Sequence, residues 1–479
     1  MSANAKEGAP APTLLLEIVS LSIPASLQLM IDWLRPLLFN VFVSSNVKAS
    51  SLSGMQAAIE LDAVSLSVIS INILCFATAY GFNGAVDSFA PQAFGAGQTL
   101  ELHLILYRQA LFLLIIMIIF FLVAIHAEGI LVALGQAPEV ASRSSDIVRL
   151  LILSVPGDFA YDLLGRWMRA QQMNRLVALA ALGGLVVNIT ANFALSGYSS
   201  ASGNVSFGPT FGLIAQNTLL PFALVAMFYM QKPPSNCGLA SKSTCTFIRV
   251  PLSSITSLSD SWPQLKTGIA STCWTCAELW AWETQIFEAG RLAFGGAASY
   301  ALCSSIYSLL IMIPVGCCTA LTALSGEALG KQNAVRAIQV AKVATRLAVA
   351  LVFAYGSALI LARGVVANAV SGGVATVEQT VAEVIPLLMA MHVLDAAFNS
   401  LKSWLTLRQY QTFGAAMSVA IYWLLGLPIG FFLAFKGGFG VEGLWLGLTV
   451  ALITGVMMSG IMACRDARHL VASSSSISA

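Results

Sequence analysis

The chain has 479 residues, of which 57% are hydrophobic and only 10% are charged, and its formal net charge is +2. Soluble globular proteins carry about 25% charged residues, so this composition excludes a soluble enzyme or a nucleic-acid-binding domain and indicates an all-α integral membrane protein. The small net charge says little about binding partners.

Twelve apolar segments approach the ~20 residues that a helix needs to cross a bilayer. The first is too long for a signal peptide and lacks a small-residue cleavage site. Short polar tails, 1–12 and 464–479, flank the spans and are expected to be cytoplasmic. The predicted spans are 13–43, 56–93, 104–125, 147–170, 175–197, 208–231, 264–292, 296–325, 340–363, 380–404, 412–435 and 439–463.

Basic residues predict the orientation of the chain. With the N-terminus in the cytoplasm, 17 of the 24 Lys and Arg residues fall in cytoplasmic segments and 6 in outer segments, with Arg35 inside a span. This bias fits the positive-inside rule and an even number of spans. The sequence has no large soluble region and no Gly-x-x-x-x-Gly-Lys loop, so we expect no ATP hydrolysis.

A polar segment, 232–263, divides the chain into two halves of six spans and is expected to be a cytoplasmic linker. We call 13–231 the N-lobe and 264–463 the C-lobe. Three residues of the fourth span recur in the tenth span, each 237 positions later, and Asp32 aligns roughly with Glu278. Such repeats are common in transporters and predict parallel halves related by a pseudo-two-fold axis along the membrane normal. The recurring pairs are Asp158 and Asp395, Trp167 and Trp404, and Gln172 and Gln409.

Nine cysteines do not form a disulfide framework, because six of them fall in the predicted spans. Cys273 and Cys276 have the spacing of a zinc or redox motif, but they lie in an apolar helix without further ligands nearby. Core packing is therefore favoured, and we expect no metal and no cofactor. Cys237 and Cys245 fall in the cytoplasmic linker and should stay reduced.

Glu278 is the most informative residue, because a carboxylate near mid-bilayer costs at least a few kcal/mol. It can hold a proton or a cation but poorly both, and that competition is the basis of antiport. The alternative is a structural hydrogen bond to a neighbouring helix. Glu283 lies five residues later, on another face of the helix, and fits a functional role or a bonded position in the lobe core equally well.

Several segments resemble the MATE (multidrug and toxic compound extrusion) transporters of the eukaryotic type. Residues 87–96 resemble the family's Asp-Thr-Leu-Cys-Gly-Gln-Ala-Phe-Gly-Ala stretch, and 326–330 resemble Gly-Asn-x-Leu-Gly. Glu278-Leu-Trp280 stands where eukaryotic members read Glu-Trp-Trp, and 426–430 and 443–447 resemble the last two helices. Departures are Pro91 in place of glycine, Leu279 in place of tryptophan, and a longer segment after the first span.

The resemblance implies two six-helix lobes facing a central cleft and an antiporter that expels organic cations or metabolites against a proton or sodium gradient. It places a cation- and proton-binding glutamate at Glu278 and a histidine and an acid at His392 and Asp395. These two residues lie three apart on one helix face, and Asn399 follows one turn later. A buried polar pair with a structural role is the alternative.

The N-lobe offers a second possible proton site at Asp32, Asp158 and Asp162. The resemblance supports it, since bacterial members use an aspartate in the first helix. Internal ion pairs are the structural alternative, because Arg35 lies three residues after Asp32 and Arg166 lies four residues after Asp162.

Aromatic side chains are expected to line the cleft, since aromatic faces attract organic cations. Asn204 lies in an Asn-x-Ser sequon of a predicted outer loop and is a glycosylation candidate. The cleft-lining candidates are Trp274, Trp282, Tyr300, Tyr307 and Asn399.

Taken together, the sequence predicts a secondary antiporter that exports organic cations, drugs or metabolites in exchange for protons. It is expected to act as a monomer in the plasma membrane or in an acidic organelle membrane. Protons are favoured over sodium because Thr275 is the only good oxygen donor within one turn of Glu278. Alternatives with the same fold are a sodium-coupled exporter and a flippase or exporter of a lipid-linked or anionic substrate. An excess of acidic residues in the spans disfavours the latter. The absence of metal-ligand and nucleophile motifs disfavours a membrane enzyme.

Overall fold

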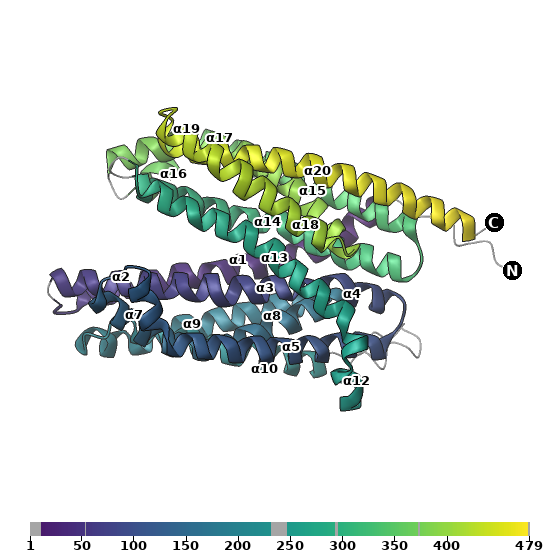
Figure 1. Ribbon diagram of the computed structural model, residues 1–479, viewed down its shortest axis with the longest axis horizontal. Coiled ribbons are helices and arrows are strands. Elements are labelled where there is room, and N and C mark those ends of the chain that lie inside the picture. The colour runs from purple at the N-terminus through teal and green to yellow at the C-terminus, as the bar shows by residue number, and fades with distance from the viewer. Residues whose placement is uncertain (1–10, 53, 231–246, 293–295, 372–373, 478–479) are drawn as a thin grey trace.

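The computed structural model describes residues 11–52, 54–230, 247–292, 296–371 and 374–477. These residues form helices and no strands, gathered in two bundles that lie side by side, with both chain ends at one end of the molecule (Figure 1). The expected all-α membrane architecture with two lobes of six spanning segments is confirmed.

The N-lobe contains six spanning segments, two of which consist of several consecutive helices. A short helix, α6 (Ala127–Ala133), precedes the fourth. The segments are α1 (Ala11–Ala49); α2 (Gly54–Ile71) with η1 (Asn72–Phe76), α3 (Ala77–Phe82) and α4 (Gly84–Gly95); α5 (Thr99–Ile125); α7 (Pro138–Leu151) with η2 (Ile152–Ser154) and α8 (Val155–Ala170); α9 (Asn174–Ala201); and α10 (Phe207–Met230).

The C-lobe repeats this plan after a short helix, α12 (Leu252–Thr256), and has a short α16 (Arg363–Val370) before its fourth span. Its segments are α13 (Leu258–Ala289); α14 (Gly296–Gly330); α15 (Ala334–Leu361); α17 (Ala375–Leu407); α18 (Gln411–Ser418) with η3 (Val419–Gly426) and α19 (Leu427–Phe435); and α20 (Gly440–Ile477). Among the described residues, ten helical segments are long and apolar enough to cross a membrane. The other two spans, α7–α8 and α13, are richer in polar residues.

Several helices extend beyond the boundaries of the predicted spans. Helix α13 begins at Leu258, six residues before the predicted start of its span, and α20 continues to Ile477 through most of the predicted polar tail. Ala, Ser and Arg residues follow the last span and permit the helix to continue into water. Residues 232–246 of the predicted linker, including Cys237 and Cys245, lie outside the described residues.

Each lobe buries its own apolar core. One cluster draws its buried residues from α1 to α10, and a second draws on α13 to α20 with only Leu29 from the N-lobe. Close packing replaces the hydrophobic effect as the force between helices in lipid, so a separate, densely packed core makes each lobe a unit of its own.

The repeat predicted from sequence is visible in the backbone. Four helices end in the same turn, with a left-handed residue at Gly97, Gln172, Gln332 or Gln409 (φ 69°, 64°, 58° and 63°). In each turn the next residue's N–H bonds to a carbonyl five residues back, which is a Schellman cap. These bonds run from 98 to 93, 173 to 168, 333 to 328 and 410 to 405. Gln172 and Gln409 are one of the matched pairs, so the turn and the sequence repeat coincide.

Contacts between the lobes obey the same symmetry. Ser26 Oγ of α1 donates to the Ile313 carbonyl of α14 at 2.9 Å, and Thr272 Oγ1 of α13 donates to the Thr78 carbonyl of α3 at 3.5 Å. Thr272 follows Ser26 by 246 positions, which is also the separation of Asp32 and Glu278. The interface is therefore isologous, and Asp32 and Glu278 are structural equivalents.

The lobes also approach closely where α4 crosses α14. A Cβ added to Gly95 would lie 2.1 Å from the Glu327 carbonyl oxygen, and one added to Gly330 would lie 2.1 Å from the Gln92 carbonyl oxygen. Gly330 follows Gly95, and Glu327 follows Gln92, by the same 235 positions, so these contacts are also symmetric. Only glycine permits this backbone approach, which joins the lobes near the end that carries both termini.

Candidate functional site

In the N-lobe, Arg35 bridges Asp32 and Asp158, which are equivalent to Glu278 and Asp395 of the C-lobe. Its guanidinium lies 3.1 Å from an Asp32 oxygen and 2.8 Å from an Asp158 oxygen, and it donates to Asn217 Oδ1 at 3.1 Å. Arg35, Asp32 and Asp158 have side-chain exposures of about 15%. The predicted internal ion pair is present, and the same arginine also binds Asp158 on a different helix.

Further polar groups complete this cluster. Gln28 donates to Asp32 and accepts from Arg169 Nη1 at 2.9 Å, and the Tyr161 hydroxyl lies 3.4 Å from both Asp32 oxygens. Arg35 and Arg169 together balance the charges of Asp32 and Asp158. The N-lobe cluster is therefore electrically neutral without a bound ion.

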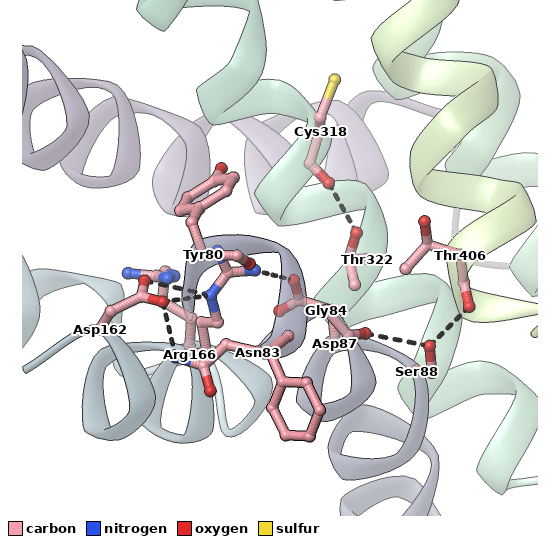
Figure 2. Close-up of polar contacts among 12 residues, drawn as sticks. Tyr80, Asn83, Gly84, Asp87, Ser88, Asp162, Arg166, Cys318, Thr322 and Thr406 are labelled. Carbon is pink, nitrogen blue, oxygen red and sulfur yellow. Dashed lines mark hydrogen bonds and ion pairs between the residues drawn. The ribbon is translucent and has the colours of Figure 1, made fainter. Parts of the chain in front are cut away.

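A second N-lobe network surrounds Arg166. Figure 2 shows its guanidinium between Asp87 of α4 and Asp162, which lies one turn away on α8. Asn83 donates to Asp162 at 2.8 Å, and the Tyr80 ring lies 4.2 Å from the guanidinium carbon. Asp162 is thus engaged in an ion pair that ties α8 to α3 and α4, which is the structural alternative foreseen for it.

In the C-lobe, Glu278 binds a cation supplied by the protein itself. The Lys402 ammonium of α17 lies 2.5 Å from Glu278 Oε2 on α13, and the two side chains are 22% and 14% exposed. The ammonium also lies 5.4 Å from the centroid of the buried Trp274 ring. A carboxylate and an aromatic face are the groups that would bind an organic cation.

Asp395 has different partners. Its carboxylate accepts from the Tyr307 hydroxyl of α14 at 2.6 Å and from Asn399 Nδ2 at 2.8 Å, and it is 5% exposed. Both donors are neutral. Glu278 and Lys402 are close enough for their charges to act on Asp395.

His392 lies on the same helix face as Asp395 but bonds elsewhere. Its Nδ1 is 2.8 Å from the Tyr355 hydroxyl of α15, and the Tyr307 ring packs edge-on against it with centroids 4.0 Å apart. The two residues are therefore linked through Tyr307 packing rather than through a direct hydrogen bond. His392 Nε2 is buried without a partner among the described residues.

The aromatic candidates belong to one packed group in the C-lobe. Trp274, Tyr300 and Tyr307 are 1%, 0% and 3% exposed, and Trp282 packs on Tyr307 with centroids 5.0 Å apart. In this conformation they pack in the core of the C-lobe. Asn399 is half-buried next to Asp395.

Two other candidates lie apart from this centre. Glu283 is half-buried one and a half turns beyond Glu278 and has no hydrogen bond to another described residue. Asn204 Oδ1 accepts from Arg143 at 2.7 Å, and Arg143 is also paired with Glu60. The sequon is therefore anchored in a polar contact of the N-lobe.

Sequence reasoning missed Lys402 and Arg169. Both were counted with the cytoplasmic basic residues, but the structure places them inside the lobes, facing Glu278 and Gln28. A helical count from Asp395 gives the missing signal, because Lys402 follows by seven residues and returns to the same face. Interior charge is consequently more balanced than the sequence indicated.

Comparison with known proteins identifies the family. A sequence model of MatE matches residues 24–194 and 276–432. The chain belongs to the MATE family. Multidrug and toxin extrusion protein 1 of Oryctolagus cuniculus is 25% identical over 414 residues, covering 86% of this chain and 70% of that protein. The Homo sapiens protein of the same name is 25% identical over 423 residues, with the same coverage.

Solved structures agree on the fold. The eukaryotic MATE transporter AtDTX14 superposes with a TM-score of 0.80 at 21% identity, covering 96% of this chain and 99% of that one. A MATE transporter in complex with MaL6 gives 0.82 at 15% identity, covering 95% and 97%. The predicted resemblance and the multi-pass membrane location are therefore confirmed, and the protein is a member of a multidrug and toxin extrusion transporter family.

Proposed function

We propose that this MATE protein is a secondary antiporter that exports organic cations in exchange for protons, with its coupling centre in the C-lobe. The observation that carries the proposal is Glu278 in the lobe interior, bound to an ammonium group and beside an aromatic ring. These are the surroundings of a cation site. The relatives' name, multidrug and toxin extrusion protein, supports small organic substrates.

The partners of Asp395 favour protons over sodium. A sodium ion needs several oxygen atoms that offer lone pairs, whereas Tyr307 and Asn399 direct an O–H and an N–H at this carboxylate. In the N-lobe, Arg35 takes the position between Asp32 and Asp158 that a metal cation would require. We therefore infer that Asp395 exchanges a proton, and that the N-lobe carboxylates act mainly in structure.

An anionic or lipid-linked substrate is the competing reading of the same fold. Interior bases could attract it, but Lys402, Arg35 and Arg166 are each engaged with a carboxylate. Arg169 donates to Gln28, which bonds Asp32. The structure therefore favours a cationic substrate. Competition of an organic anion with tetraethylammonium for transport would support the other reading.

Transport by reconstituted protein tests the proposal. Proteoliposomes with an acidic lumen should accumulate radiolabelled tetraethylammonium, a permanent cation, and should need no sodium. Glu278→Gln keeps the side-chain shape but removes the charge, so uptake should fall at least about tenfold, the equivalent of 1.4 kcal/mol.

The matched control is Glu383→Gln, an exposed carboxyl on α17 whose one hydrogen bond among the described residues is to Gln379. It should transport like the wild type. Uptake that follows a sodium gradient at fixed pH and ignores pH steps would overturn proton coupling. Full proton-driven uptake by Glu278→Gln would overturn the assignment of the site.

A further inference from the structure

The two lobes treat equivalent pairs of carboxylates differently. Asp32 corresponds to Glu278 and Asp158 corresponds to Asp395. In the N-lobe one cation, Arg35, binds both members of the pair. In the C-lobe the cation Lys402 binds Glu278 only, and Asp395 is left with neutral donors.

The base also comes from a different position in each lobe. Arg35 is on α1 beside Asp32, whereas Lys402 is on α17 two turns beyond Asp395. Seven residues of helix rise roughly 10 Å, and side chains lean toward the N-terminus of their helix, which is the direction of Asp395. A flexible lysine on this face can therefore be directed at either carboxylate, while the rigid, forked guanidinium of arginine suits a permanent bridge.

We propose that Lys402 is a switch that moves its ammonium from Glu278 to Asp395 when a cationic substrate binds. This rests on the proposed function and specifies how substrate binding releases a proton. Before binding, Lys402 neutralises Glu278 and the Asp395 carboxyl is protonated, since a buried carboxylate with only neutral partners would be costly. The substrate then takes the place of the ammonium on Glu278 and beside Trp274.

The displaced ammonium pairs with Asp395, whose proton leaves to water. The three groups carry no net charge before binding. After binding, the substrate and Lys402 balance the two carboxylates, so the charge is again zero and one proton has been exchanged for one monovalent cation. Lys402 is thus a positioning residue, because it acts through Asp395 and the proton that Asp395 holds.

Other titratable groups surround the three residues. Tyr307, Tyr355 and Tyr422 face Asp395 from α14, α15 and η3, Cys318 faces it from α14, and His392 shares its helix. Glu283 lies farther along α13. Of these, Tyr307 already donates to Asp395 and His392 is bound to Tyr355, so Asp395 is the acid best placed to respond to Lys402.

Binding of tetraphenylphosphonium, a cation without titratable groups, tests the switch in purified full-length protein. Calorimetry in buffers of different ionisation enthalpy counts the protons released. The wild type should release about one proton per cation bound. Asp395→Asn should release almost none, because the acid that supplies the proton is absent. Lys402→Met should bind about tenfold more tightly, because no tethered ammonium competes. Lys402→Arg should keep much of the wild-type proton release.

A double substitution makes the test specific. Asp395→Asn gives Lys402 no carboxylate to move to, so tetraphenylphosphonium affinity should fall by about tenfold. Adding Lys402→Met to Asp395→Asn should restore the affinity. A lysine that only holds α13 against α17 would give the opposite result, with a second loss of affinity.

Three outcomes separate the proposals. Proton release that is unchanged in Asp395→Asn, or a double variant that binds no better than Asp395→Asn, would overturn the switch and leave cation export intact. A wild type that binds no organic cation would overturn the proposed function. Thermal unfolding and gel-filtration profiles of each variant, with Glu383→Gln as reference, identify any variant that fails to fold.

Discussion

At the scale of single residues, the C-lobe site consists of two acids with unlike surroundings. Glu278 faces a full positive charge, and Asp395 faces a hydroxyl and an amide. The ammonium compensates the charge of the Glu278 carboxylate, whereas neutral donors leave the charge of an ionised, buried carboxylate uncompensated. In the proposed mechanism, this division lets one carboxylate bind the cation while the other exchanges the proton.

Tyr307→Phe isolates the proton-exchanging carboxyl. In the wild type, the bond from the Tyr307 hydroxyl stabilises the ionised form of Asp395, and the substitution removes it. A buried bond to a charged group contributes about 1.5–3 kcal/mol. Tetraethylammonium uptake should therefore have its pH profile moved to higher pH, while the protein remains folded. Initial uptake rates measured across a series of pH values provide the check.

Tyr300→Phe is the control for this substitution. Its hydroxyl donates to Gln285 at 2.9 Å in the same aromatic group, but touches no carboxylate. Tyr300→Phe should lower thermal stability about as much as Tyr307→Phe does, and it should leave the pH profile of uptake unchanged. Equal shifts in both variants would mean that aromatic packing, rather than the bond to Asp395, sets the profile.

Residue spacing predicted the local ion pairs but not those between helices. Asp32 with Arg35 and Asp162 with Arg166 lie within one turn, so helical periodicity alone brings them together. Glu278 and Lys402 are 124 positions apart, and their contact depends on how α13 packs on the C-lobe. Pairwise geometry of this kind requires the packed structure.

At the scale of helices, interruptions fall where packing requires them. Pro24, Pro314 and Pro386 lie inside continuous helices, whereas Pro156 follows a short 3-10 turn at the start of α8. A proline at the start of a helix has no N–H bond to lose. All four prolines fall in predicted spans, but only the packed structure shows which of them lies at a break in its helix.

Gly330→Ala should weaken the closed contact between α4 and α14. Its new methyl would meet the Gln92 backbone, which cannot rotate away, so the two lobes should separate near the chain ends. A cysteine placed at Ser88, which is buried and donates to the Thr406 carbonyl across the lobes (Figure 2), should then react faster with a maleimide.

The control for this contact is Gly364→Ala, since a Cβ at Gly364 meets nothing within 4 Å. It should leave the labelling rate of the same cysteine unchanged. Labelling that is equally slow in Gly330→Ala would show that the crossing tolerates a methyl group and is not a determinant of lobe closure.

At the scale of the whole molecule, the duplicated pattern was sufficient to predict two lobes and their pairing. Matched positions such as Trp167 and Trp404 revealed the repeat because both halves keep the same turn after the helix. Their contacts have diverged, however. Trp167 Nε1 donates to the Leu102 carbonyl, while Trp404 Nε1 donates to Asp466 of α20. The late part of α20 was predicted as a polar tail, so no repeat could reveal that partner.

The symmetric interface implies that transport requires the lobes to separate at the end where they now meet. Glu17 of α1 and Arg336 of α15 form an ion pair of 3.0 Å across that end, with both side chains about one-third exposed. Replacing both by cysteine and joining them with a short bifunctional thiol reagent should arrest tetraethylammonium exchange, and a cleavable reagent should allow reduction to restore it. Exposed surface pairs contribute at most about 1 kcal/mol, so the unlinked double variant should transport nearly normally.

Glu17→Cys alone, treated in the same way, controls for reaction at the exposed Cys273 and Cys464. Exchange that continues in the cross-linked protein would show that these two helix ends move together, and that the lobes separate along a different surface.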